Sequence, residues 1–129
     1  MIEGQASGTK TPKLRYGMVG GGQDAFIGDV HRKAVAMDGK AEIVCGAFSQ
    51  TYKNTLATGD ALGLPRKRLY KTFEDMIRAE AGRADRPDFI SIVTPNSTHY
   101  AAAKLTLEHG FAVVCEKPLA TSYQNAADL

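Results

Sequence analysis

The chain has little of what marks several classes of protein. Its 129 residues include only two cysteines, Cys45 and Cys115, and both lie in runs that we expect to be buried strands. Buried free cysteines behave as small hydrophobic residues, so we predict neither a disulfide framework nor a metal site, and a reducing cytoplasmic compartment. The formal net charge of +2 gives no argument for a nucleic-acid or membrane partner. No apolar run reaches the roughly 18 residues of a membrane-spanning helix.

The N-terminal segment also lacks an apolar stretch. Residues 1–13 contain nothing like the hydrophobic part of a secretory signal, and we predict that they form a disordered tail. Residues 14–129 have the length of one domain with a single core. The sequence therefore predicts one folded unit over 14–129.

Strand-like and helix-like segments alternate through residues 14–129, which favours an α/β fold with a doubly wound parallel sheet. Right-handed crossovers then place the first strand at the centre and predict the order 3-2-1-4-5. The expected strands are 14–19, 41–48, a short third strand at 68–70, 88–94 and 111–116. The expected helices are 27–38, 52–62, 73–82 capped by Thr72, one capped by Asn96 or Ser97 that runs to His109, and one that starts near Thr121.

A glycine-rich turn, Gly20-Gly21-Gly22, follows the first strand and precedes a helix. Strand, glycine turn and helix form the arrangement that binds dinucleotides, because a diphosphate must approach backbone N–H groups and the positive end of a helix dipole. Gly20 and Gly22 fit the first two positions of G-x-G-x-x-G, but residue 25 is alanine. We interpret 23–27 as a loop lengthened by three residues, with Gly28 as the displaced third glycine. On this evidence alone, a simple turn accounts for the pattern equally well.

The run Phe111-Ala-Val-Val-Cys-Glu-Lys-Pro118 is typical of a buried parallel strand that ends at an acid, a lysine and a proline. Ligands of such sheets bind just beyond the carboxyl ends of the strands. We therefore expect Lys117 to lie where a ligand sits and to exchange a proton with it. The alternative is a solvated lysine at a strand end.

Together these segments resemble the glucose–fructose oxidoreductase, inositol dehydrogenase and rhizopine-catabolism (Gfo/Idh/MocA) family of NAD(P)-dependent oxidoreductases. The resemblance covers nearly all of 14–129. The residues that carry it are Gly20-Gly21-Gly22 with Gly28 and His31, Ser91–Asn96 with His99, and Glu116-Lys117-Pro118.

The resemblance implies a Rossmann domain and a lysine, Lys117, that assists hydride transfer to or from a carbon of a sugar or polyol. It also implies that Glu116 hydrogen-bonds the nicotinamide ribose, and that a second α/β domain, absent from this chain, carries most of the substrate site. The full-length enzyme would be a homo-oligomer, and this chain alone would bind cofactor but turn over little or no substrate.

The end of the second strand selects the cofactor. Phe48-Ser49-Gln50-Thr51 has no acid to bind the ribose hydroxyls, and no arginine stands beside it to bind a 2′-phosphate. Ser49 can bond a hydroxyl without repelling a phosphate, and Lys53 is the nearest cation. We predict NAD and leave NADP open.

Several residues have two interpretations. Asn96 contacts the cofactor or caps a helix, Thr94 and Pro95 line the nicotinamide side or shape the turn, and Glu116 binds ribose or holds Lys117. His31 and His99 contact a ligand or pack within the fold. Phe26 and Ile27 cover the diphosphate or reach the substrate side. The predicted cofactor-binding residues are Gly20, Gly22, Gln23, Ala25, Phe26, Ile27, Gly28, Ser49, Thr94, Pro95, Asn96, His99, Glu116 and Lys117.

Two other functions stay open at this point. The domain could sense NAD(P) and regulate a partner without catalysis, or bind another nucleotide or coenzyme. The chain has no G-x-x-x-x-G-K-[ST] pattern, which excludes a nucleoside-triphosphate P-loop.

Overall fold

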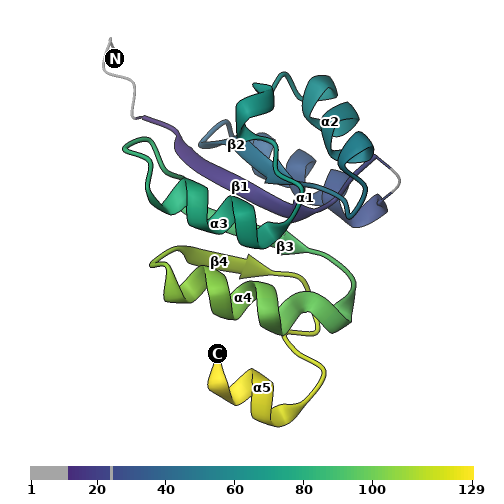
Figure 1. Cartoon of the computed structure of the whole chain (residues 1–129), viewed down its shortest axis with the longest axis vertical. Coiled ribbons are helices and arrows are strands. Elements are labelled where there is room, and N and C mark those ends of the chain that lie inside the picture. Colours follow the sequence, from purple (N-terminus) through teal and green to yellow (C-terminus); the bar gives the residue numbers. More distant parts are fainter. Residues whose placement is uncertain (1–11, 24) are drawn as a thin grey trace.

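The computed structural model describes residues 12–23 and 25–129. Its centre is a sheet of four parallel strands in the order β2-β1-β3-β4 (Figure 1). The strands are β1 (Leu14–Gly20), β2 (Ala41–Ala47), β3 (Phe89–Val93) and β4 (Ala112–Cys115). The doubly wound order is confirmed for the predicted strands 2-1-4-5, of which the fourth and fifth are β3 and β4, and the switch point lies between β1 and β3.

The expected third strand is reduced to a single bridge. Leu69 pairs with Gly46 of β2, on the side away from β1, and the Tyr70 N–H donates to the Gly46 carbonyl at 2.9 Å. A 3₁₀ turn, η1 (Arg66–Arg68), comes immediately before it. The Leu69 N–H donates back into that turn, to the Arg66 carbonyl, so it does not contribute to a ladder with β2. The position of the segment is as predicted, but its length is not.

The described residues form five α-helices: α1 (Phe26–Ala36), α2 (Tyr52–Ala61), α3 (Phe73–Ala81), α4 (His99–Glu108) and α5 (Tyr123–Asp128). The first four lie between strands along the chain, and α5 follows the last strand. Thr72 caps α3 as predicted, because its side chain accepts a hydrogen bond from the Asp75 N–H at 3.1 Å. The prediction that Asn96 or Ser97 caps α4 is wrong. A 3₁₀ turn, η2 (Asn96–Thr98), precedes that helix, and neither turn nor helix has a side-chain cap.

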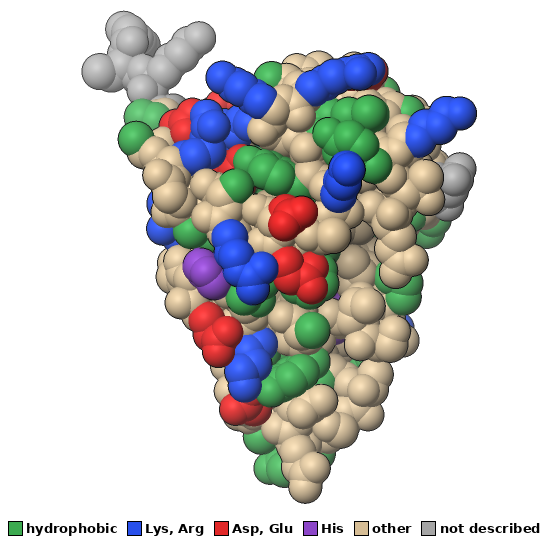
Figure 2. Space-filling model, in the orientation of Figure 1, with side chains coloured by type: hydrophobic (Ala, Val, Ile, Leu, Met, Phe, Trp, Pro, Cys, Tyr) green, Lys and Arg blue, Asp and Glu red, His purple; other side chains and the backbone are tan. Residues whose placement is uncertain are grey.

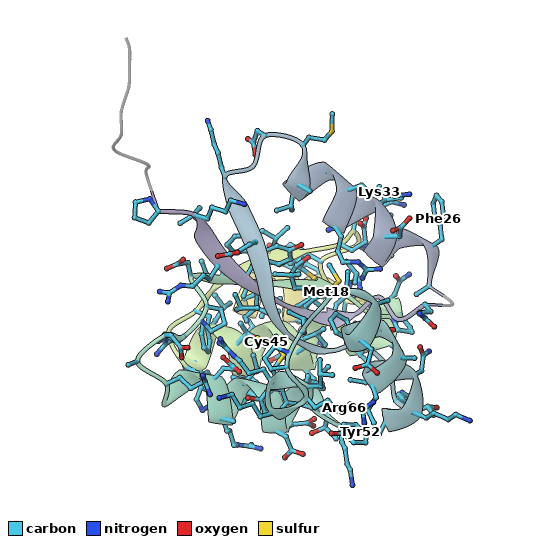
Figure 3. All side chains as sticks on the ribbon, turned by 90° about the horizontal axis from the view of Figure 1, so that it is seen from above. Met18, Phe26, Lys33, Cys45, Tyr52 and Arg66 are labelled. Carbon is cyan, nitrogen blue, oxygen red and sulfur yellow. The ribbon has the colours of Figure 1, made fainter. Side chains whose placement is uncertain are left out.

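The helices form a layer on each face of the sheet, with a separate hydrophobic core beneath each layer. One core contains Ile77 of α3 and Ala103 of α4, and Figure 1 shows these two helices side by side. The other core includes Ile27 of α1 and Leu56 of α2. Met18 and Cys45, labelled in Figure 3, lie inside the molecule and are fully buried.

The exterior carries charges of both signs. Figure 2 shows Lys and Arg side chains next to Asp and Glu side chains on the face formed by α3 and α4. Among the described residues, no helix is long and apolar enough to cross a membrane. The predicted tail at 1–13 falls almost entirely outside the described residues, and Pro12 and Lys13 are exposed and have no regular structure.

Candidate functional site

A cavity of about 650 Å³ lies beyond the carboxyl ends of β1, β2 and β3. Parallel sheets bind ligands at this edge, beside the switch point. Four separate segments line the cavity: 19–22 with Ala25, 47–51 with Asn54, 71–74, and 93–95 with Thr98. The predicted site residues in this lining are Gly20, Gly22, Ala25, Ser49, Thr94 and Pro95.

Glycines form the cavity wall after β1 because no other residue fits there. Gly20 and Gly21 have φ angles of +84° and +78°, a region that side chains disfavour. A Cβ on Gly20 would also lie 2.9 Å from the Thr94 nitrogen, and one on Gly21 would lie 2.8 Å from the Met18 sulfur. The Gly22 N–H donates to the Phe48 carbonyl at 3.0 Å. The turn is thus fixed against the ends of β2 and β3.

The helix after this turn begins earlier than predicted. Phe26 is its first residue, so the loop ends at Ala25 and does not extend to Ile27. Phe26 is 81% exposed and projects outwards (Figure 3), whereas Ile27 packs into the core below α1. A Cβ on Gly28 would lie 2.3 Å from the Gly21 Cα, so Gly28 allows the close helix packing expected of a third glycine.

The start of α1 suits an anion. Its N-cap is Ala25, which has no side-chain oxygen, so the cap makes no side-chain hydrogen bond to the first turn. First-turn N–H groups have no partner within a helix and carry the positive end of the dipole. A diphosphate beside the glycine turn would satisfy them, as at other helix N-termini of this kind. Gln23 is exposed, and its N–H donates to Thr58 Oγ1 at 3.1 Å, which ties the loop to α2.

Ser49 lies at the end of β2 and lines the cavity, as predicted from its position. Its N–H donates to Thr55 Oγ1 at 3.0 Å, and its own Oγ accepts from the Thr51 N–H at 3.1 Å. Ser49 Oγ donates to no acceptor among the described residues, so its proton can bond a ligand oxygen. Lys71 and Glu74 also line this cavity, and the sequence analysis missed both. The signal for them was the position of 71–74 just after the predicted third strand, whose carboxyl end lies at the same edge.

At the end of β3, Thr94 carries an unsatisfied polar atom. Thr94 Oγ1 is buried and has no hydrogen-bond partner among the described residues, and Thr94 lines the cavity. Buried hydroxyls without a partner are rare in folded proteins, so this atom fits a site that a ligand completes. Asn96 is exposed in η2 and lies outside the cavity lining.

Glu116 and Lys117 follow β4, next to the end of β3 but outside the cavity lining. His31 Nε2 donates to Glu116 Oε2 at 2.6 Å, and the other carboxylate oxygen accepts the Lys117 N–H at 3.1 Å. The bond from His31, followed by that from the Lys117 N–H, holds the pKa of Glu116 below its usual value. Lys117 is exposed.

His99 is buried beneath this segment. Its exposed fraction is 0%, and both ring nitrogens face backbone carbonyl oxygens: Nδ1 lies 2.6 Å from that of Pro118, and Nε2 lies 2.8 Å from that of Thr94. The contact with a ligand that we expected for His99 stays a prediction. The structure shows it joining the ends of β3 and β4.

These features define a class of protein. A parallel sheet with a central switch point, a glycine turn that opens an uncapped helix, and a cavity between them form a dinucleotide-binding domain of the Rossmann type.

Comparisons with known proteins agree with that class. Residues 14–129 match the family model described as "Oxidoreductase family, NAD-binding Rossmann fold". The chain therefore belongs to the Gfo/Idh/MocA oxidoreductase family, whose Rossmann domain binds NAD.

The individual relatives are longer than this chain. The uncharacterized oxidoreductase YfiI of Bacillus subtilis is 40% identical over 107 residues, which are 82% of this chain and 27% of the relative. A crystal structure of an oxidoreductase from Sinorhizobium meliloti has 44% identity and a TM-score of 0.86 over 92% of this chain and 33% of its own. An inositol dehydrogenase homolog from Azotobacter vinelandii, complexed with NADH and myo-inositol, has 37% identity and a TM-score of 0.87 over 90% of this chain and 31% of its own.

Proposed function

We propose that the chain is the cofactor domain of a longer NAD(P)-dependent dehydrogenase that acts on a sugar or polyol hydroxyl, with Lys117 as the proton donor and acceptor. The observation that carries the proposal is the cavity at the switch point, where the glycine turn, Ser49 and Thr94 meet. The buried Thr94 Oγ1 has no hydrogen-bond partner among the described residues. The inositol dehydrogenase homolog in complex with NADH and myo-inositol supports the substrate class.

The residues divide the binding of a dinucleotide between them. Backbone N–H groups at the start of α1 receive the diphosphate, and the Ser49 hydroxyl bonds the adenosine ribose. Thr94 and Pro95 adjoin the nicotinamide side, where Thr94 Oγ1 gains its missing partner. Ser49 brings no negative charge against a 2′-phosphate, and Lys71 lines the same cavity, so NADP is included as a second cofactor.

A bound nicotinamide supplies or accepts a hydride. Lys117 has the complementary task of moving the hydroxyl proton of the substrate. Its neutral amine takes that proton as the carbinol carbon becomes a carbonyl, and its ammonium form returns the proton in the reverse direction. Glu116, held by His31, stands beside it as the carboxylate expected to bond the nicotinamide ribose.

The first test is calorimetric titration of the chain with NAD, NADH, NADP and NADPH. The informative variant is Gly20→Ala, which combines a positive φ with a Cβ 2.9 Å from the Thr94 nitrogen. Gly39→Ala is its matched control, because Gly39 has a φ of +68° but no atom within 4 Å of the added Cβ. Both variants carry the backbone strain of roughly 1–2 kcal/mol. Because the clash with Thr94 also lowers the stability of Gly20→Ala, thermal unfolding of both variants must show that each is folded at the temperature of the titration.

We expect Gly20→Ala to abolish cofactor binding and Gly39→Ala to keep it. Equal affinities in the two variants would contradict a dinucleotide site at the glycine turn. Lys117→Ala in the full-length enzyme should bind NAD normally and lose turnover of polyols such as myo-inositol by about 10²–10⁴-fold, the usual contribution of general acid–base catalysis. Unchanged turnover would remove Lys117 from the mechanism.

A further inference from the structure

The sheet does not hold Lys117 in place. The last hydrogen bond between β4 and β3 runs from the Glu116 N–H to the Ile92 carbonyl, at 2.9 Å. The Lys117 N–H donates to the side chain of its own neighbour, Glu116, at 3.1 Å, and Pro118 has no N–H to donate. The backbone that carries Lys117 has therefore left the ladder and depends on other contacts.

Two histidines provide contacts on the two sides of Lys117. His31 Nε2, in α1, lies 2.6 Å from the carboxylate of Glu116, the residue before Lys117. His99 Nδ1, in α4, lies 2.6 Å from the carbonyl oxygen of Pro118, the residue after Lys117. Carboxylate and carbonyl oxygens only accept, so each contact is a hydrogen bond when the facing ring nitrogen carries a proton.

The two histidines come from opposite layers of the fold. The helix that carries His31 covers one face of the sheet, and the helix that carries His99 covers the other. The other ring nitrogen of His99, Nε2, lies 2.8 Å from the Thr94 carbonyl, at the edge of the cavity. A neutral imidazole has only one N–H, so the ring bonds Pro118 when Nδ1 carries the proton and Thr94 when Nε2 carries it. The segment that carries Lys117 is thus in contact with both helical layers.

We propose that His31 and His99 are positioning residues that fix Lys117 by holding Glu116 and Pro118. The inference rests on the proposed function, in which Lys117 transfers the substrate proton. A catalytic group must be held within about 0.5 Å of its working geometry by neighbours that are themselves fixed, and a segment outside the ladder needs such neighbours. His99 acts here without touching a ligand, because both of its nitrogens face backbone oxygens.

Substitution by asparagine or by glutamine distinguishes the roles of the two ring nitrogens of each histidine. The amide nitrogen of asparagine comes near the place of Nδ1, and that of glutamine comes near the place of Nε2. His99→Asn therefore keeps a donor for Pro118, whereas His99→Gln keeps one for Thr94. At residue 31 the order is reversed: His31→Gln keeps the donor for Glu116, and His31→Asn loses it.

The readout is the NMR order parameter of the Lys117 amide in each variant of the chain, with thermal unfolding as a control for folding. We expect a value near 0.85 in the parent, His99→Asn and His31→Gln, and a fall towards about 0.6 in His99→Gln and His31→Asn. A purely structural role would make the two variants at each position alike, and that result would overturn the proposal.

Kinetics of the full-length enzyme separate this inference from the proposed function. With the anchoring in place, His99→Gln lowers kcat more than His99→Asn does, while the Kd for NAD is the same in both. One outcome is that Lys117→Ala keeps its turnover while the order parameter falls in His99→Gln and His31→Asn but not in His99→Asn and His31→Gln. The proposed function then fails and the anchoring stands. If Lys117→Ala loses turnover but the four histidine variants are alike, the anchoring fails.

Discussion

Glu80→Gln tests the energetic support beneath one wall of the cavity. Glu80 is fully buried, and Arg68 is 7% exposed. Arg68 Nε donates to Glu80 Oε2 at 3.1 Å, and the Tyr70 hydroxyl donates to the same oxygen at 2.7 Å. These contacts join η1 to α3 on either side of residues 71–74, which line the cavity.

The expected loss of stability is large because the change removes the buried one of the two carboxylates that face the Arg68 guanidinium. Removing one partner of a buried ion pair costs about 3–5 kcal/mol. The new side chain still offers one oxygen, and Arg68 keeps Asp85 at 3.5 Å, so we take the lower end, about 3 kcal/mol. For a domain of this size, that corresponds to a fall in Tm of roughly 10 °C.

Urea unfolding followed by far-ultraviolet circular dichroism measures the effect, since the chain has no tryptophan. Glu108→Gln makes the same chemical change at an exposed position of α4 and should stay within about 0.5 kcal/mol of the parent. A loss below about 1 kcal/mol for Glu80→Gln would refute the reasoning, because the pair would then be worth no more than a surface salt bridge.

Three further predictions follow from packing and charge. Gly28→Ala should weaken NAD binding, because its Cβ would meet the Gly21 backbone, while Gly59→Ala, whose Cβ meets the Leu69 side chain, should lower stability alone. Glu116→Gln should lower the Tm near pH 7, and this difference should vanish as pH falls below the usual glutamate pKa of 4.5 and through the depressed pKa of Glu116. Burial raises the pKa of both thiols, so Cys45 should resist a thiol reagent at pH 8 until the protein unfolds, and Cys115 should react slowly.

Each of these predictions has a clear contradictory result. Equal NAD affinities for the two glycine variants would separate Gly28 from the binding site. A Glu116→Gln difference that grows as pH falls would mean that the carboxylate is destabilising in the fold. Fast labelling of Cys45 in the native protein would show that the sheet opens there more readily than its burial indicates.

Local patterns predicted the framework of the fold well. Alternating segments and the handedness of crossovers were enough for the strand order, because those rules depend on chain topology and not on individual contacts. The predicted helices 27–38 and 52–62 each end at the residue before a glycine, and these glycines, Gly39 and Gly63, have positive φ values of 68° and 74°. In a parallel sheet of this order, the glycine turn after β1 and the end of β3 lie at the same edge, so their proximity could also be predicted.

Other features depended on contacts that no local pattern contains. The start of α1 was misplaced because Ala25 gives no capping signal, and the helix begins there without a side-chain cap. The cap expected at Asn96 or Ser97 was wrong because η2 precedes α4. The pairing of Glu116 with His31 joins residues 85 positions apart, so it could be found only from the folded structure.

The candidate site contains one part that the chain topology places and one part that side-chain contacts place. The cavity wall is formed by backbone and strand ends, which the topology places without special side chains. The lysine segment lies beyond the last hydrogen bond of the ladder and depends on two side-chain contacts of 2.6 Å. Hydrogen bonds of this kind are lost by changing a single atom, whereas the cavity needs a change of volume or backbone angle. Cofactor binding and the positioning of Lys117 should therefore be separable by mutation, although both depend on the same edge of one sheet.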